Sequence, residues 1–245
     1  MDADLLHDLA PTGKLRAAIN LGNVVLAQKD SATGEAKGVS VDLARELARR
    51  LSVPLDLVLF DIAGKVVEAI RDGAWDIAFL ALDPARAEQI EFTAPYVIIE
   101  GTYMVHAHTA FRTVEDVDQP GMRIAVGKNA AYDLYLSRTL KHAELVRAPT
   151  SAQAIELFVA ERLDAAAGVR ETLMQHARSN PQVRVMNGRF MAIEQAMAMP
   201  RGREAGARYL RAFVEEMKAE GFVAKALATS GQRDATVAPP APLST

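Results

Sequence analysis

The sequence predicts an α/β fold with two lobes, each built on a doubly wound sheet, joined by a two-strand hinge. Short apolar runs of the kind that form buried strands alternate with segments of helical periodicity along most of the chain. This alternation stops once and then restarts, which gives two separate βαβ blocks. Two extended segments, residues 91–106 and 189–197, follow the first and the second block, and each can lead the chain from one lobe to the other.

The first block is predicted to contain three strands and two helices. Its strands are apolar runs bounded by turn residues, and its helices place their apolar side chains on one stripe. This order favours a mostly parallel sheet with helices on both faces. The predicted elements are, in chain order, residues 15–20, 41–51, 55–60, 63–71 and 76–82.

The second block repeats the alternation of strand and helix, and two more helices follow it. We expect these last two helices, residues 202–220 and 221–230, to return to the first lobe. The elements predicted inside the second block are residues 123–126, 130–140, 145–148, 151–160, 165–168, 169–179 and 183–185.

This order predicts a discontinuous first lobe and an inserted second one. We assign residues 1–105 plus 196–234 to the first lobe and 106–195 to the second. The tail, residues 235–245, holds three prolines and no aromatic residue, so we expect it to be flexible.

The composition excludes several classes of function. The 245 residues carry a net charge of −3 with scattered basic residues, which argues against nucleic acid as a partner. The absence of cysteine excludes disulfides, thiolate zinc sites and thiol nucleophiles. His106 and His108 lack a third ligand at metal spacing, and no nucleotide-binding or hydrolase motif occurs, so we expect neither a metal nor a cofactor.

The first residues do not resemble a secretory signal, which needs a basic start followed by an apolar stretch. Two alternatives remain open. Either a leader was trimmed from this sequence, or the protein is made without one. No apolar run approaches the length of about 18–20 residues that a membrane span needs.

An anion site is predicted where the strand at residues 76–82 ends. Asp83 is a suitable N-cap and Pro84 a suitable first residue for a short helix, and Arg86 follows in its first turn. Ligands of open α/β sheets bind beyond the carboxyl ends of the strands, and a guanidinium matches a carboxylate. The alternative is a solvated arginine paired with Glu88 or Glu91.

A second anion site is predicted at residues 127–130, where a strand turns into a helix. Lys128 adds positive charge, Asn129 can cap the new helix, and the first free amides, around Ala130, can bind an anion. The alternative is an ordinary capped turn. Two such sites facing each other across a cleft would clamp a small acid.

Other candidates have equally plain structural alternatives. Asn20 and Lys65 follow predicted strands but can serve as a turn residue and a solvated lysine. Tyr132 can face the cleft or pack in its helix. Arg170 can bind a second acid group of the ligand or pair with Glu161 or Glu171.

Five motifs in this order resemble the bacterial extracellular solute-binding proteins of family 3, the amino-acid receptors of ABC importers. The likeness covers roughly residues 12–230. The motifs are residues 38–43 (GVSVDL), 75–77 (WDI) with Arg86, 90–96 (IEFTAPY), 121–127 (GMRIAVG) and 163–168 (LDAAAG).

This resemblance implies a type II periplasmic-binding fold in which Arg86 and the turn at residues 127–130 bind the ligand carboxylate. Val39 replaces a frequent aromatic residue, and Val169 stands where an aspartate usually binds the α-ammonium group. A buried ammonium without a counter-charge is costly. The ligand is therefore expected to be an organic or keto acid, or an amino acid bound through Glu100 or Glu194.

The resemblance implies a monomeric, periplasmic, non-enzymatic protein that delivers a small carboxylate to an ABC permease. One alternative is an enzyme similar to cyclohexadienyl dehydratase, acting on prephenate or arogenate with Glu194 or Glu100 as general acid. The other is a leaderless cytoplasmic sensor of small acids.

Overall fold

The computed structural model describes residues 3–232 and 235–242, and within these ranges the chain forms two compact units. The first unit comprises the residues up to Asp61, Lys65–Ile98 and the residues from Glu194 onward. The second comprises Ile62–Gly64 and Ile99–Ile193. Apart from the short stretch Ile62–Gly64, the chain passes from one unit to the other inside two strands, β6 and β11.

The first of these passages lies seven residues before the predicted boundary at 105/106, because β6 (Ile90–His106) continues as one strand and only changes partners. Its residues Val97 and Ile98 pair with β12, whereas Gly101 and the residues after it pair with β9. The periodicity of a strand does not reveal which strand it pairs with.

The sheet of the first unit is built around β1. This central strand runs parallel to β4 and β5, with Ala17 opposite both Leu57 and Ile77, and β11 runs antiparallel to β5. All five residues of β5 are buried, as expected for a strand covered on both faces. The strands are β4 (Leu55–Phe60), β1 (Leu15–Asn20), β5 (Ile77–Ala81) and β11 (Met191–Pro200).

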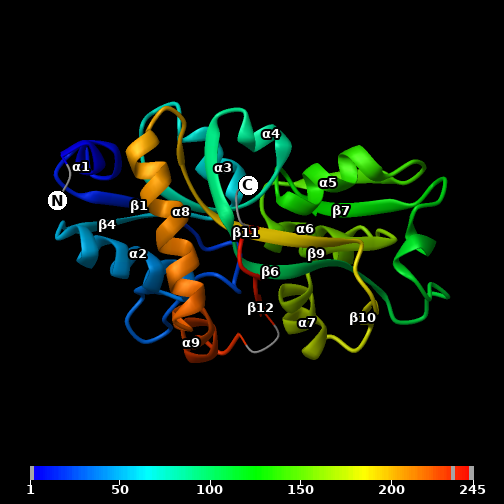
Figure 1. Cartoon of the computed structure of the whole chain (residues 1–245). Helices are drawn as coiled ribbons and strands as arrows, with labels where there is room; N and C mark the ends of the chain where they lie inside the picture. Colours follow the sequence, from blue (N-terminus) through cyan, green and yellow to red (C-terminus); the bar gives the residue numbers. More distant parts are fainter. Residues whose placement is uncertain (1–2, 233–234, 243–245) are drawn as a thin grey trace. The chain divides into compact units, whose positions relative to one another are not determined.

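The longer helices of the first unit bury one apolar stripe each. In α2, Leu43, Leu47 and Leu51 are almost completely buried at helical spacing. Helix α8 packs against α1 and α9, and α9 also packs against α2, so the last two helices belong to the first unit (Figure 1). The helices are α1 (Ala3–Leu9), α2 (Val39–Leu51), α3 (Ala63–Glu68), α4 (Pro84–Ala87), α8 (Glu204–Ala219) and α9 (Phe222–Thr229).

The second unit has the strand order β6–β9–β7–β8, with β10 on the outer edge of β6. β7 is parallel to β8 and β9, whereas β9 is antiparallel to β6. Phe158 is fully buried at the centre of its core. The elements are η1 (Val114–Val117), β7 (Arg123–Gly127), α5 (Ala131–Thr139), β8 (Glu144–Ala148), α6 (Ser151–Ala160), β9 (Ala165–Val169), α7 (Arg170–Arg178) and β10 (Val183–Val185).

Every predicted strand and helix is present, with ends shifted by three residues or fewer. The sequence analysis missed α1, η1 and the two-residue strands β2 (Gln28–Lys29) and β3 (Ala36–Lys37). These elements are too short to show a clear period. Helix α1, for example, buries only Leu5 and Leu9 of its seven residues.

The prediction of a flexible tail is wrong for residues 236–242; residues 243–245 lie outside the described part of the chain. Strand β12 (Thr236–Val237) pairs with the edge of β6, and Ala238 is 3% exposed. Its amide donates to the carbonyl of Tyr96 at 3.1 Å. An open strand edge offers unpaired backbone groups, and this proline-rich segment satisfies some of them.

Candidate functional site

Arg86 lies at the carboxyl end of β5, as predicted. Asp83 caps α4 by accepting a hydrogen bond from the Ala85 amide at 2.9 Å, with Pro84 in the first turn. The capped turn directs the Arg86 side chain inward, where its Nη1 donates to the carbonyl of Ala81, the last residue of β5, at 3.1 Å. Arg86 is only 3% exposed, so the alternative of a solvated side chain does not hold.

Burial has an electrostatic consequence for Arg86. Desolvation lowers the pKa of its guanidinium to about 10, and the nearby Asp83 carboxylate opposes part of this shift. The side chain is therefore still cationic at neutral pH. Burial removes water from around this positive charge, which strengthens its interaction with any nearby negative charge.

Two further polar side chains near the first motif are buried in the first unit. Ser40, the second residue of α2, is 1% exposed, and its Oγ lies 3.3 Å from the Oη of Tyr96. Burial raises the pKa of the Tyr96 phenol, so it remains protonated and able to donate. The sequence analysis did not single out this pair, because a serine in an apolar helical stripe carries no distinctive signal.

Asn20 and Lys65 have the roles given as alternatives to ligand binding: Asn20 is a turn residue, and Lys65 is a solvated lysine. The Oδ1 of Asn20 accepts a hydrogen bond from the Gly22 amide at 3.0 Å and so stabilises the turn after β1. Lys65 lies 3.6 Å from Asp61 one helical turn earlier, with 56% of its side chain exposed. Glu194 is exposed at the start of the first-unit part of β11, and its carbonyl accepts from Leu82 at 2.8 Å.

In the second unit, the turn after β7 differs from the prediction. Asn129 does not cap α5, because it adopts a left-handed conformation with φ of 60° and the cap residue is Ala130. Its amide donates instead to the carboxylate of Asp133 at 2.8 Å. The sequence analysis missed Asp133, a 2% exposed residue that also pairs with Arg147 at 3.0 Å.

The amides that were expected to bind an anion are largely used within the chain. The amide of Lys128 donates to Ala148 at 2.9 Å, and that of Ala130 donates to Gly127 at 3.1 Å. The amides of Ala131 and Tyr132 come next, in the first turn of α5, where helix geometry provides no intrahelical acceptor. The expected amides at residues 127–130 are thus mostly bonded, and the amides available by helix geometry lie one turn further along the chain, while the side chain of Lys128 is exposed.

Tyr132 is 4% exposed and connects α5 to α6. Its Oη donates to the Oγ of Ser151 at 2.8 Å, and burial raises the pKa of the phenol. A side chain at Gly127 would come within 3.0 Å of Ser151, so the close approach of these segments requires glycine. Tyr132 therefore supports the first turn of α5 through packing.

The structural alternative for Arg170 was an ion pair with Glu161 or Glu171. The structure shows neither of these pairs within the described residues. The Nε of Arg170 donates to Glu100 at 2.6 Å, and its Nη groups donate to the carbonyls of Met186 and Gly188. Arg189 approaches the other oxygen of Glu100 at 3.3 Å. Arg170 thus ties β6 to the segment before β11, a long-range arrangement that sequence spacing does not indicate.

An aromatic cluster in the second unit also escaped the sequence analysis. The ring of Phe190 lies 4.6 Å from that of Tyr103 and 6.1 Å from that of Tyr135. Gly101 packs beneath it, since a side chain there would meet Phe190 at 3.0 Å. Phe190 comes from an extended segment without periodicity, so nothing in the sequence marks it.

Comparison with known families agrees with the motifs. Residues 22–230 match the model of the bacterial extracellular solute-binding proteins, family 3. No curated protein sequence gives a significant match. No helix in the described part of the chain is long and apolar enough to cross a membrane. The same residues contain no group of three or more side chains that could hold a metal ion.

Solved structures with the same fold include three from this class of protein. The substrate-binding protein AbpA of a Streptococcus pneumoniae amino-acid ABC transporter, bound to L-arginine, has a TM-score of 0.78 at 19% identity, covering 91% of this chain and 96% of that one. A cysteine-binding protein from Campylobacter jejuni has 0.79 at 19%, covering 92% of each chain. The ancestral amino-acid-binding protein AncCDT-1, a precursor of cyclohexadienyl dehydratase, has 0.77 at 22%, covering 91% and 97%.

Proposed function

The chain belongs to the bacterial extracellular solute-binding proteins of family 3 and has their two-lobed type II fold, and we propose that its solute is a small carboxylate, a class that Arg86 in the first unit and the first turn of α5 in the second unit each favour. Both positions follow the carboxyl end of a buried strand. Such ends are the usual location of ligands in open α/β sheets.

The observation that carries this proposal is the burial of Arg86. A guanidinium that is 3% exposed places a positive charge and a planar fork of donors in a low-dielectric environment at the end of β5. A carboxylate matches that fork with two parallel hydrogen bonds, which are stronger than bonds between neutral groups. An anionic solute is therefore the class that Arg86 favours most.

The amides of Ala131 and Tyr132 support the same class from the second unit. The positive end of the α5 dipole points out of this turn and stabilises negative charge. Asp133 in the same turn opposes an anion, but Arg147 compensates its charge at 3.0 Å. We infer that these two amides favour the same anionic class of ligand as Arg86 does in its own unit.

The proposed ligand lacks an α-ammonium group. Val169, at the end of β9, offers no counter-charge, and both carboxylate oxygens of Glu100 are already paired with Arg170 and Arg189. Glu194 is exposed on β11, where water screens its charge. A 2-oxo or other organic acid avoids the cost of burying an ammonium without a partner.

We further propose that the protein releases its solute unchanged to an ABC permease outside the cytoplasm. The matched family is extracellular, and the similar structures are named as binding proteins. A dehydratase would need a protonated side chain as its general acid. Glu100 does not suit this role, because Arg170 and Arg189 pair with its carboxylate and favour the ionised form.

The experiment compares ligands that differ only at the amino group. Native mass spectrometry of the purified protein identifies retained acids, and calorimetry then tests pairs such as L-glutamate with 2-oxoglutarate and L-alanine with pyruvate. We expect the oxo acid of a pair to bind more tightly. Tighter binding of the amino acid in each pair would refute the ligand class, and turnover of prephenate would refute the non-enzymatic role.

A further inference from the structure

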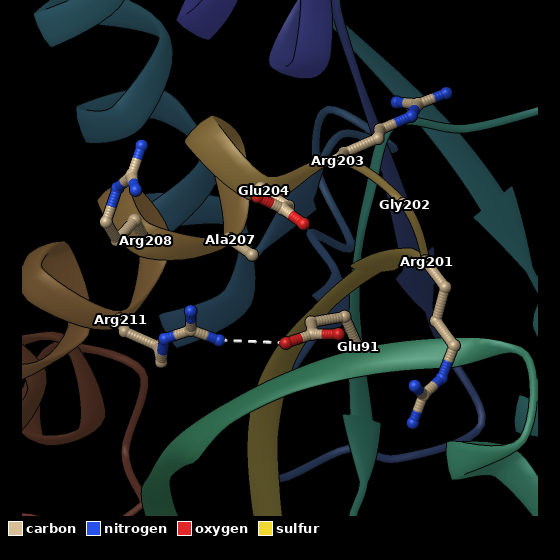
Figure 2. A pocket seen from close by; sticks show the side chains of 8 residues that line it. All are labelled: Glu91, Arg201, Gly202, Arg203, Glu204, Ala207, Arg208 and Arg211. Carbon is tan, nitrogen blue, oxygen red and sulfur yellow. Dashed lines mark hydrogen bonds and ion pairs between the residues drawn. The ribbon is translucent and has the colours of Figure 1, made fainter. Parts of the chain in front are cut away.

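A cavity of about 430 Å³ opens in the first unit beside the start of α8 (Figure 2). It is lined by side chains from β6, from the turn between β11 and α8, and from the first two turns of α8. None of the residues proposed for the solute lines it. Its charged residues are Glu91, Arg201, Arg203, Glu204, Arg208 and Arg211.

The cavity is positively charged on an acidic protein. Four arginines against two glutamates leave an excess of two positive charges, whereas the whole chain carries −3. Like charges gathered in a concave surface reinforce one another's potential, since water screens them less there than on a convex surface. Such a concentration of positive charge favours the binding of an anion.

Two of the arginines are used within the protein. Arg211 donates to Glu91 at 2.9 Å, the pair joined by the dashed line in Figure 2. Arg203 donates to the carbonyl of Asp8 at 2.8 Å and reaches the fully buried Asp76 at 3.3 Å. These two side chains therefore build the wall of the cavity.

The other two arginines keep donors available. Among the residues that the structure describes, the guanidinium of Arg201 bonds through its Nε alone, which donates to the carbonyl of Ala87 at 2.8 Å. Within the described residues, the side chains of Arg208 and Glu204 have no hydrogen bond or ion pair, and Figure 2 shows the guanidinium groups of Arg201 and Arg208 on opposite sides of Glu204. The guanidinium ends of Arg201 and Arg208 can therefore turn to an incoming anion.

We propose that this cavity is a second ligand site, which binds a small molecule through a phosphate group. Guanidinium forks match phosphate oxygens in charge and geometry, and clustered arginines are a recurring way to recognise phosphate. The volume exceeds that of a free phosphate ion and lies within the range of about 300–1,000 Å³ found for organic ligands. This inference does not depend on the identity of the solute.

The first test measures pyrophosphate binding to the full chain by calorimetry at about 50 mM salt, where charge interactions are weakly screened. We expect saturable binding that the double variant Arg201→Ala/Arg208→Ala weakens by about tenfold or more. The variant Glu204→Gln removes the opposing charge, so it should bind pyrophosphate severalfold more tightly. Solute affinity should stay unchanged in both variants.

A matched control removes two exposed arginines elsewhere, Arg112→Ala/Arg178→Ala. This control has the same net charge as the double variant and should retain the affinity of the wild-type chain. Equal weakening in both would show non-specific attraction and overturn the site, as would the absence of saturable binding to the wild-type chain. Thermal melts confirm that each variant is folded.

A second arm distinguishes the source of the phosphate. The protein is sedimented with phosphatidylcholine vesicles containing phosphatidylglycerol. Binding that pyrophosphate displaces and that Arg201→Ala/Arg208→Ala abolishes would assign a lipid headgroup. Pyrophosphate binding without vesicle binding would assign a free phosphate compound, and failure of both would overturn the proposal.

Discussion

Arg170 at the start of α7 and Glu100 within β6 form an ion pair in the second unit, with Nε and Oε2 2.6 Å apart. This pair decides how Glu100 can act. A carboxylate that already accepts from one guanidinium on each oxygen has little capacity left for a ligand ammonium. The geometry therefore assigns Glu100 to the stability of the second unit.

The variant Glu100→Gln tests this assignment. Both ion pairs are partly exposed, so we expect a loss of only about 1 kcal/mol in the free energy of unfolding, measured by urea denaturation. Ligand affinity should change little. An affinity loss much larger than the stability loss would contradict the assignment and would return Glu100 to the ligand site. Glu161→Gln, on an exposed position of the same unit, is the control.

Asp83 is predicted to position Arg86 through the N-cap of α4. The variant Asp83→Ala removes the acceptor for the Ala85 amide and should cost about 1 kcal/mol of stability. Because Arg86 lies one turn away, solute affinity measured by calorimetry should also fall. Asp83→Asn keeps a capping oxygen and should retain most of the affinity. Equal affinity losses for both variants would show that the charge of Asp83, rather than the cap, matters.

The tail is predicted to stabilise the first unit. Ending the chain after Gln232 removes β12 and the buried Ala238, whose burial and strand pairing should contribute about 1–2 kcal/mol. The melting temperature should drop by several degrees. Ala238→Asp in the full chain, which places a charge in the same buried position, should have a similar effect. Unchanged melting in both would contradict the described packing of the tail.

Acid should destabilise the protein partly through Glu46. Its ion pairs with Arg49 and Arg50 lower the pKa of the carboxyl from 4.5 to about 2. A carboxyl whose pKa is lower in the folded state contributes stability above pH 4.5 and loses it as the pH falls toward 2. Urea denaturation at several pH values should show a shallower decline for Glu46→Gln. An unchanged decline would contradict this role.

The elements of the fold were predictable because strand and helix periods are local. β1, β4, α6 and β10 have the predicted bounds, since turn residues flank each of them. The tail was not predictable. Its composition indicates flexibility, and only the open edge of β6, formed by residues more than a hundred positions earlier, explains why it is ordered.

In the candidate site, too, local features were predictable and long-range contacts were not. The position of Arg86 followed from local features, the strand end and the cap at Asp83. The role of Asn129 did not, because Asp133 takes the Asn129 amide and shifts the cap to Ala130. Arg170 pairs with Glu100, which lies 70 residues earlier in the chain. Residue spacing within one helix cannot indicate such a contact. Long-range pairs decide which charged side chains remain available.

The affinity of the variant Arg86→Met for the retained solute tests the central claim most directly. Methionine fills similar space without charge, and circular dichroism establishes that the variant is folded. We predict that calorimetry shows an affinity loss of about 100-fold or more, as removing one partner of a buried charge-assisted contact costs about 2–5 kcal/mol. A folded variant that binds the solute as tightly as the wild-type chain would contradict the account.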